Sequence, residues 1–333
     1  MPLVSILTPV KATTPSQVQW LIEAIESVKK QTVPLDTWEM IIVDDSSAAD
    51  LKPLTDYIKS SGLKNVHGAK CKGSGAVDAR NQAAQRAKGE LLLPLDADDK
   101  LPAYAIETLL KGWDNDGKQA GIVYGDVLYF GQDLQREFTA RTYDFATLLS
   151  QLFMPVGSLH SKESWTKVGG WKSEMSAGLE DWEYWIALGE LGVCGMYIPE
   201  VLYHYRRHGY GRLASLRSSI DGYQKAYAQM RDLHRDSYSG RFPMGCCGKS
   251  NVRYPAPVAA AALSATPMQG STQVLYVGGR KGSFCIVGRA SGIMYQVNGR
   301  GNPVTTMEGQ TGVDQRDVPY FKAINSGRDF QTI

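Results

Sequence analysis

Three aspartates, Asp96, Asp98 and Asp99, lie within four positions directly after an apolar run in LLLPLDADD. Like charges this close repel one another, so the cluster needs a positive partner or abundant water. A divalent cation, held by one or two carboxylates and completed by nucleotide phosphates, would neutralise the cluster and bind a substrate at once. The alternative is that the aspartates cap a turn and the following helix. The density of carboxylates favours the cation.

A second acidic pair, Asp44 and Asp45, follows another apolar run in EMIIVDD. If both runs are neighbouring parallel strands, their carboxyl ends meet at one edge of the sheet, where ligands of such sheets bind. The two clusters therefore predict a single site at that edge.

The elements that must position these residues alternate between strands and helices. Four apolar runs are strand candidates: LVSILTPV, EMIIVDD, NVHGAKC and ELLLPLD. Between the first two, Thr14, Pro15 and Gln17 supply the N-cap, first-turn proline and capping-box partner of a helix. An alanine-rich helix is expected from Val77 to Lys88, ended by Gly89. This alternation predicts an α/β fold with a mostly parallel central sheet and helices on both faces.

The composition narrows the class of protein. The 333 residues carry a net charge of +2, from 36 basic and 34 acidic residues, so overall charge makes nucleic acid an unlikely partner. The N-terminal sequence lacks a signal-peptide pattern, and no apolar run reaches the roughly 18 residues of a membrane span. The 5 cysteines suggest no disulfide framework. We therefore expect a cytoplasmic protein without a membrane span.

Five stretches in order give the sequence a family resemblance: VSILTPV, VDDSS, ARNQAAQRAKGELLLPLDADD, LEDWEYWIALGELG and LYHYRRHG. Together they resemble the family 2 glycosyltransferases of the nucleotide-diphospho-sugar (GT-A, Rossmann-like) fold, over roughly residues 3–210. The resemblance implies that Thr8 and Pro9 pack against the nucleotide base and that Asp45 accepts a hydrogen bond from uracil. It also implies that Arg80 and Asn81 lie near the nucleotide.

The resemblance further implies a metal site. Asp96 and Asp98 match the two acidic positions of the family's Asp-X-Asp motif, with Asp98 the most direct ligand of Mn²⁺ or Mg²⁺. His208 matches a histidine that binds the metal or the pyrophosphate. The residues themselves add that HYRRHGYGR is a local positive patch, in which Arg206 is suited to hold a diphosphate because guanidinium groups bind phosphate in a bidentate manner.

Catalysis would need a separate carboxylate, and the resemblance assigns the general base of an inverting transfer to Asp181. This residue opens an apolar helix, whose positive end helps to keep a carboxylate ionised. Simple N-terminal capping by Asp181 is the alternative. For Trp182 and Trp185 on the same helix, core packing of at least one is favoured over stacking on a sugar.

The C-terminal third differs in character. One amphipathic helix is expected over residues 214–236, which would close a catalytic domain of residues 1–237. Residues 238–270 have a linker composition, and GCCGKS within them fails as a P-loop because Pro243 replaces the first glycine. Cys246 and Cys247 fit exposed thiols better than a zinc site.

Glycine-separated runs over residues 271–333 predict a small all-β domain, similar to short β modules of tailed-phage and prophage proteins. A docking or assembly role is expected for it.

These observations favour an inverting, metal-dependent enzyme that moves a sugar from a UDP-sugar to a hydroxyl acceptor, on a protein or a polysaccharide. Two alternatives stay open: a non-catalytic module with the nucleotide-sugar fold, and glycosylation of a modified nucleic-acid base. The choice of donor sugar is expected to depend on loops within residues 131–160.

Overall fold

The computed structural model describes residues 2–117, 121–132, 136–208 and 220–240, and beyond them the backbone of short strands between residues 271 and 332. The chain divides into two compact units. Among the described residues, the first unit holds those up to 208 together with 229–237. The second holds 220–228, 238–240 and the strands after residue 270.

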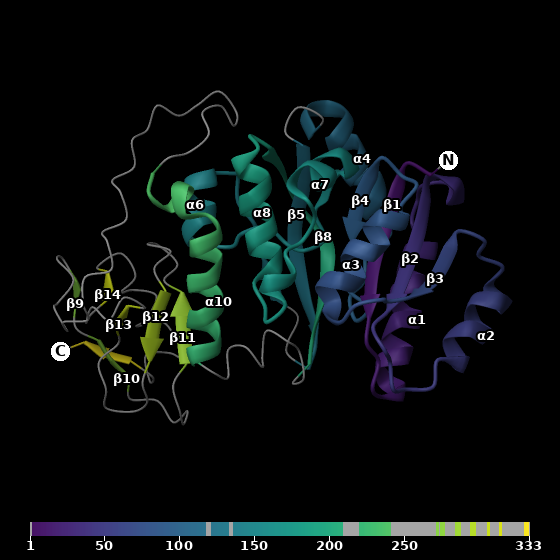
Figure 1. Ribbon diagram of the computed structural model, residues 1–333, viewed down its shortest axis with the longest axis horizontal. Coiled ribbons are helices and arrows are strands. Elements are labelled where there is room, and N and C mark those ends of the chain that lie inside the picture. The colour runs from purple at the N-terminus through teal and green to yellow at the C-terminus, as the bar shows by residue number, and fades with distance from the viewer. Residues whose placement is uncertain are drawn as a thin grey trace. The chain divides into compact units, whose positions relative to one another are not determined.

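The first unit is built on an eight-stranded mixed sheet in the order β3-β2-β1-β4-β7-β5-β6, with β8 paired to β5. Figure 1 shows β3, β2, β1 and β4 side by side in this order. Its parallel core is the run β3-β2-β1-β4, and β8 also runs parallel to β5. The short strand β7 is antiparallel to both β4 and β5. The strands are β1 (Val4–Val10), β2 (Trp38–Asp44), β3 (Val66–Lys70), β4 (Leu91–Pro94), β5 (Gly121–Gly131), β6 (Arg136–Phe138), β7 (Leu159–Ser161) and β8 (Cys194–Arg207). The predicted α/β fold with a mostly parallel sheet is confirmed.

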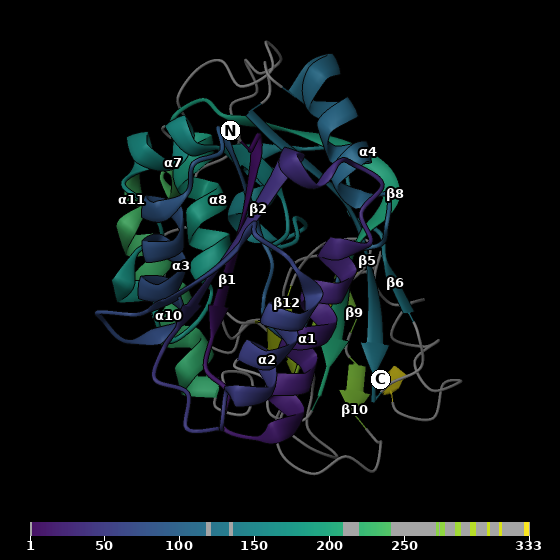
Figure 2. The same ribbon diagram turned by 90° about the vertical axis from the view of Figure 1, so that its right-hand side faces the viewer.

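Helices cover both faces of this sheet, with α3, α7 and α8 on one side of β1 and α1 and α4 on the other (Figure 2). The α-helices are α1 (Pro15–Lys29), α2 (Lys52–Ser61), α3 (Gly75–Arg86), α4 (Ala105–Gly112), α6 (Phe145–Ser150), α7 (Lys162–Val168), α8 (Glu180–Glu190), α10 (Ile220–Leu233) and α11 (Arg235–Tyr238). Short helical turns are η1 (Leu35–Thr37), η2 (Trp113–Gly117) and η3 (Ser173–Met175).

The sequence signals for α1 are confirmed in detail. Thr14 is the N-cap, its side chain accepts from the Gln17 backbone N–H, and Pro15 occupies the first turn. Val18, Leu21 and other apolar residues of α1 are buried against β1, β2 and β4, because their helical spacing places them on one face.

The end of α3 differs from the prediction. The helix runs from Gly75 to Arg86, and its C-cap is Ala87 in an extended conformation rather than Gly89. Gly89 instead lies against β1, where an added Cβ would meet the Leu3 carbonyl and Ser5 at 2.8 Å. Its lack of a side chain therefore serves a close backbone approach, not a helix stop.

The tail contains the short strands β10 (Val274–Tyr276), β11 (Phe284–Val287) and β12 (Met294–Val297). Further short strands are β9 (Ser271–Thr272), β13 (Thr305–Thr306), β14 (Val313–Asp314) and β15 (Phe330–Thr332). They form three small antiparallel sheets. Residues 214–219 of the expected helix, most of the expected linker, and Cys246 and Cys247 lie outside the described residues. The domain boundaries stay a prediction.

Candidate active site

The three clustered aspartates have three different partners. The Arg80 Nη2 donates to Asp96 Oδ1 at 2.8 Å. The ring nitrogen Nε2 of His208 lies 2.8 Å from Asp98 Oδ2. Asp99 turns inward and is fully buried, whereas the Asp96 and Asp98 side chains keep 28% and 36% of their surface exposed. The turn after β4 therefore presents two carboxylates to solvent and buries the third.

The buried aspartate anchors the turn. Asp99 accepts hydrogen bonds from the Tyr203 hydroxyl and from the Arg206 backbone N–H, both at 2.7 Å. Burial, and then the charges of Asp98 and Asp96, raise the pKa of Asp99 well above its usual range. Since Tyr203 and Arg206 belong to β8, these bonds fix the turn after β4 to the end of that strand.

Arg80 joins this turn to helix α8. Its guanidinium is fully buried, and Nη1 donates to Asp181 Oδ1 at 3.0 Å and lies 3.5 Å from Glu180 Oε1. Burial by itself opposes the charge, but the carboxylates of Asp181 and Asp96 dominate and raise the pKa of Arg80 above its usual value. A permanent cation thus holds two carboxylates that lie far apart in the sequence.

Asn81 does not join the acidic cluster but holds the loop before α8. Its Nδ2 donates to the Trp171 carbonyl at 2.8 Å, and its Oδ1 accepts from the Trp171 backbone N–H at 3.0 Å. The Trp171 ring in turn lies under the Arg80 guanidinium, with the central carbon 5.5 Å from the ring centroid. The neighbouring residues of α3 therefore act together around one buried guanidinium.

Asp181 lies in the first turn of α8, where the helix dipole favours a negative charge. The N-cap is Leu179 in the left-handed conformation, without a side-chain capping bond. The capping alternative for Asp181 therefore loses its support. Trp182 and Trp185 are both buried, in agreement with core packing.

Asp44, the last residue of β2, and Asp45, which follows it, divide in the same way as the larger cluster. Asp44 accepts from the Ser47 backbone N–H at 2.9 Å and closes its own turn. Asp45 is buried and accepts from the Gly75 backbone N–H at 2.9 Å, and from Lys11 Nζ at 3.4 Å. Its carboxylate thus joins the end of β2 to the first residue of α3, the helix that carries Arg80.

Thr8 and Pro9 lie near the end of β1, paired in register with Ile42 and Val43 of β2. Both are buried, and Thr8 Oγ1 has no hydrogen-bond partner. They share the sheet edge with Asp45 but make no described contact with the acidic turn after β4.

The positive patch at the end of β8 is already engaged by protein groups. Arg206 donates from Nε to the Asp98 carbonyl and from Nη2 to Glu23, each at 2.7 Å. Its guanidinium lies 4.4 Å from the Phe130 ring centroid and 5.2 Å from that of Trp20. The Trp20 ring also packs 4.8 Å from His208.

Sequence reasoning missed Trp20, Glu23 and Tyr203. Trp20 and Glu23 lie off the apolar stripe of α1, and a large aromatic residue off that stripe was the available signal. Tyr203 gave no such signal, because its position in the sequence resembles any other apolar position of a strand.

Asp98 and His208 form the part of the site that fits a divalent cation. Asp98 and His208 already approach each other, His208 is 9% exposed, and its Nδ1 is buried without a partner. Within the part of the chain that the structure describes, no group of three or more histidine, cysteine or acidic side chains is arranged to hold a metal alone. The donor set therefore suits a cation whose coordination is completed by phosphate oxygens and water.

Across the same described residues, no helix combines the length and apolar character needed to cross a membrane.

Comparison with known proteins gives a family match and partial relatives. Residues 5–169 match the model of glycosyl transferase family 2. The putative teichuronic acid biosynthesis glycosyltransferase TuaG of Bacillus subtilis is 33% identical over 111 residues, which are 33% of this chain and 41% of that protein. The putative colanic acid biosynthesis glycosyl transferase WcaA of Escherichia coli is 37% identical over 101 residues, 30% of this chain and 33% of that protein. The chain spans less than half the length of these relatives.

Solved structures share the fold at low sequence identity. S. aureus TarS 1–349 in complex with UDP-GlcNAc superposes with a TM-score of 0.57 and 15% identity, covering 70% of this chain and 66% of that one. The mannosyltransferase PcManGT from Pyrobaculum calidifontis, in complex with GDP-Man and Mn²⁺, gives a TM-score of 0.53 and 18% identity, covering 73% and 66%. The family match, the shared fold and the ordered motifs agree, and the chain carries a glycosyl transferase family 2 domain over residues 5–169.

Proposed function

We propose that this protein is an inverting glycosyltransferase that moves a sugar from a UDP-sugar to a hydroxyl acceptor with the help of Mn²⁺ or Mg²⁺. The observation that carries the proposal is the juxtaposition of Asp96 and Asp181 on one buried arginine. It brings the acidic turn after β4 and the first turn of α8 to one place, as a direct transfer between a donor and an acceptor requires.

Asp98 and His208 would hold the cation, with Asp96 beside them. The bound cation would neutralise the diphosphate and stabilise the charge that develops as the nucleoside diphosphate leaves. Arg206 adds a positive charge beside the Asp98 backbone, which favours a diphosphate at this edge. The Mn²⁺ complex of PcManGT supports the choice of cation.

Asp181 would take the proton from the acceptor hydroxyl as its oxygen attacks the anomeric carbon. The new bond forms while the bond from that carbon to the diphosphate breaks, so the configuration inverts in one step. Asp181 would accept this proton from the first turn of α8, where Arg80 Nη1 holds its Oδ1 in place.

Asp45 would select the base, because a carboxylate can accept a hydrogen bond from the imide N–H of uracil. Thr8 and Pro9 would pack beside it. The UDP-GlcNAc complex of TarS supports a UDP-sugar donor, and the names of the TuaG and WcaA relatives support a polysaccharide acceptor.

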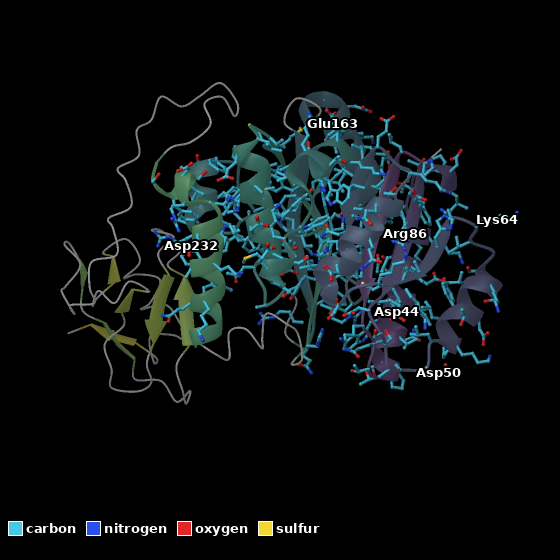
Figure 3. The ribbon with its side chains drawn as sticks, in the orientation of Figure 1. Asp44, Asp50, Lys64, Arg86, Glu163 and Asp232 are labelled. Carbon is cyan, nitrogen blue, oxygen red and sulfur yellow. The ribbon has the colours of Figure 1, made fainter. Side chains whose placement is uncertain are left out.

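Thermal melting of the purified protein tests the donor site. UDP with Mn²⁺ is expected to raise the melting temperature, GDP to raise it less, and Asp98→Ala to abolish the rise. Asp50→Ala is the matched control, because Asp50 is an exposed carboxylate in the loop after β2 (Figure 3). A protein that shows no shift with any nucleoside diphosphate and divalent ion would contradict the proposal and favour a non-catalytic module.

A screen of UDP-sugars for slow hydrolysis then names the donor without requiring the acceptor. Release of UDP from one sugar well above the others is the expected result. The product anomer from that donor, read by NMR, tests inversion.

A further inference from the structure

We propose that Arg80 and Asn81 position the catalytic carboxylates rather than bind the nucleotide. The proposal rests on the proposed function above, because it concerns how the same site is held in its reactive geometry. It assigns Arg80 the task of fixing Asp96 and Asp181 relative to each other, and Asn81 the task of fixing the aromatic ring that lies against Arg80.

The exposed fractions of the Arg80, Asp96 and Asp181 side chains support this positioning role. The Arg80 side chain is 0% exposed, whereas Asp96 and Asp181 keep 28% and 26% of their side-chain surface exposed. A ligand at the surface can therefore reach the carboxylates, while the guanidinium lies behind them.

The Arg80 guanidinium binds the two carboxylates through its two terminal nitrogens. Nη2 donates to Asp96 at 2.8 Å and Nη1 donates to Asp181 at 3.0 Å, so two nitrogens of one rigid plane define the distance between two carboxylates. These residues are 16 and 101 positions away from Arg80 in the sequence. A flexible ammonium group could neutralise either carboxylate but could not impose the same spacing on both.

Asn81 completes the arrangement through the loop before α8. Two of its hydrogen bonds go to the backbone of Trp171, whose ring contacts the guanidinium and also stacks on Tyr184 of α8 at 4.3 Å. Its Oδ1 also accepts from the Trp165 Nε1 at 3.3 Å. Gly170 allows this approach, because a Cβ there would lie 2.5 Å from Asn81 Oδ1. Arg80 is thus fixed through its charge on one side and through Trp171 on the other.

The number of carboxylates around residue 80 explains why this position needs an arginine. Three carboxylates, those of Asp96, Glu180 and Asp181, lie within 3.5 Å of one buried guanidinium. Arginine keeps its proton at every accessible pH, so the cation that holds these carboxylates is never discharged. A buried cation with fewer donors would leave a carboxylate without its hydrogen bond.

The test compares Arg80→Lys with Arg86→Lys on the same helix. Arg86 is exposed at the end of α3 (Figure 3), and its Nη1 donates to the Gln82 carbonyl, so it is a control of equal chemistry outside the site. With the donor found by the screen, Arg80→Lys is expected to lower kcat by about 100-fold, the cost of misplacing reacting groups by about 1 Å. KM for the donor is expected to change by less than about threefold, because Asp98 and His208 hold each other.

A double-variant cycle separates positioning from general damage to the fold. If Arg80 acts through Asp181, Arg80→Lys should lower kcat by less than about threefold in an Asp181→Asn background, since the effects of coupled residues do not add. Titration calorimetry of UDP with Mn²⁺ gives a readout apart from turnover. There, Arg80→Lys should retain binding that Asp98→Ala loses.

Asn81→Ala serves as a second variant should Arg80→Lys not fold, with an expected fall in kcat of about tenfold through the loosened Trp171. Activity of Arg80→Lys within about twofold of the wild type, or an undiminished effect in the Asp181→Asn background, would overturn the positioning role. A wild-type protein that binds no nucleotide and hydrolyses no donor would overturn the proposed function itself, and this inference with it.

Discussion

Helix α8 contributes carboxylates to two charge clusters of opposite design. At its start, Glu180 and Asp181 face the buried guanidinium of Arg80. Further along the helix, Glu183 and Glu190 face His234, whose Nε2 and Nδ1 lie 3.1 Å and 2.8 Å from their carboxylates. One cluster uses a cation that never titrates and the other a cation that can be discharged.

The geometry requires His234 to be an imidazolium, because each ring nitrogen faces a carboxylate and a carboxylate only accepts hydrogen bonds. Burial by itself lowers the pKa of His234, but the hydrogen bonds and charges of Glu183 and Glu190 raise it to about 9. Ser237 adds a hydrogen bond to Glu190. The comparison shows that the permanent cation lies at the candidate active site, whereas the titratable cation lies between Glu183 and Glu190 of α8.

His160 is a third case, a buried histidine whose described hydrogen bond goes to a carbonyl and not to a carboxylate. It therefore shows the effect of burial on the pKa without that of an ion pair. It is fully buried among Trp171, Tyr184 and Trp185, and its Nδ1 donates to the Ser158 carbonyl at 3.0 Å. Here burial dominates and lowers the pKa of His160 to about 4, which the bond to Ser158 only partly offsets. Two buried histidines therefore titrate on opposite sides of neutral pH.

Asp181→Asn should have the largest effect, because it removes the proposed base and one anchor of Arg80. We expect kcat to fall by about 10²- to 10⁴-fold, the usual contribution of general base catalysis. Binding of UDP with Mn²⁺, measured by calorimetry, should persist. Comparable turnover in this variant would remove Asp181 as the base.

His234→Ala should destabilise the protein by about 3 kcal/mol, because it leaves Glu183 buried without a counter-charge. The measurement is the free energy of unfolding in urea. Arg235→Ala is the control, since Arg235 is exposed and pairs only with the exposed Asp232 among its described contacts. Adding Glu183→Gln to His234→Ala should restore part of the loss, and no restoration would argue against the charge as its cause.

The pH dependence of stability should differ between the clusters. The folded-state pKa of His234 is about 9, above the unfolded value near 6.5, so its contribution is complete below pH 6.5 and is lost as pH rises through 9. Unfolding curves of the wild type between pH 6 and 10 should show this loss, and His234→Gln should lack it. Equal slopes in both proteins would mean that His234 is not charged in the fold.

His160 should produce a pH dependence of the opposite sign. Its folded-state pKa of about 4 lies below the unfolded value, so its contribution is complete above pH 6.5 and is lost as pH falls toward 4. His160→Asn keeps a donor for the Ser158 carbonyl and removes the titration. The variant should lose less stability than the wild type between pH 6.5 and 4, and an unchanged difference across that range would contradict the assignment.

Much of the fold of the first unit could be predicted from local sequence signals. The strands β1, β2 and β4 are short apolar runs, and the capping box at Thr14 marks the start of α1 because its interactions lie within a few residues. The acidic ends of β2 and β4 could be placed at one edge because parallel neighbours end together.

What could not be predicted depends on contacts across the chain. Arg80 was recognised, but its partner Asp181 lies 101 residues away, and no local pattern reveals which carboxylates one guanidinium will bridge. The same holds for His234. The helical spacing of the residues around it indicates no role for this side chain, and its partner Glu183 is 51 residues away. The short antiparallel strand β7 was missed because three residues give too little periodicity to distinguish a strand from a loop.

The most direct test of the central claim is anomalous diffraction from crystals grown with UDP and Mn²⁺. The account predicts a manganese peak bound by Asp98 and the diphosphate, with uracil at Asp45 and with Arg80 still joining Asp96 to Asp181. Manganese and nucleotide bound elsewhere, or Asp98 turned away from an empty edge, would contradict it.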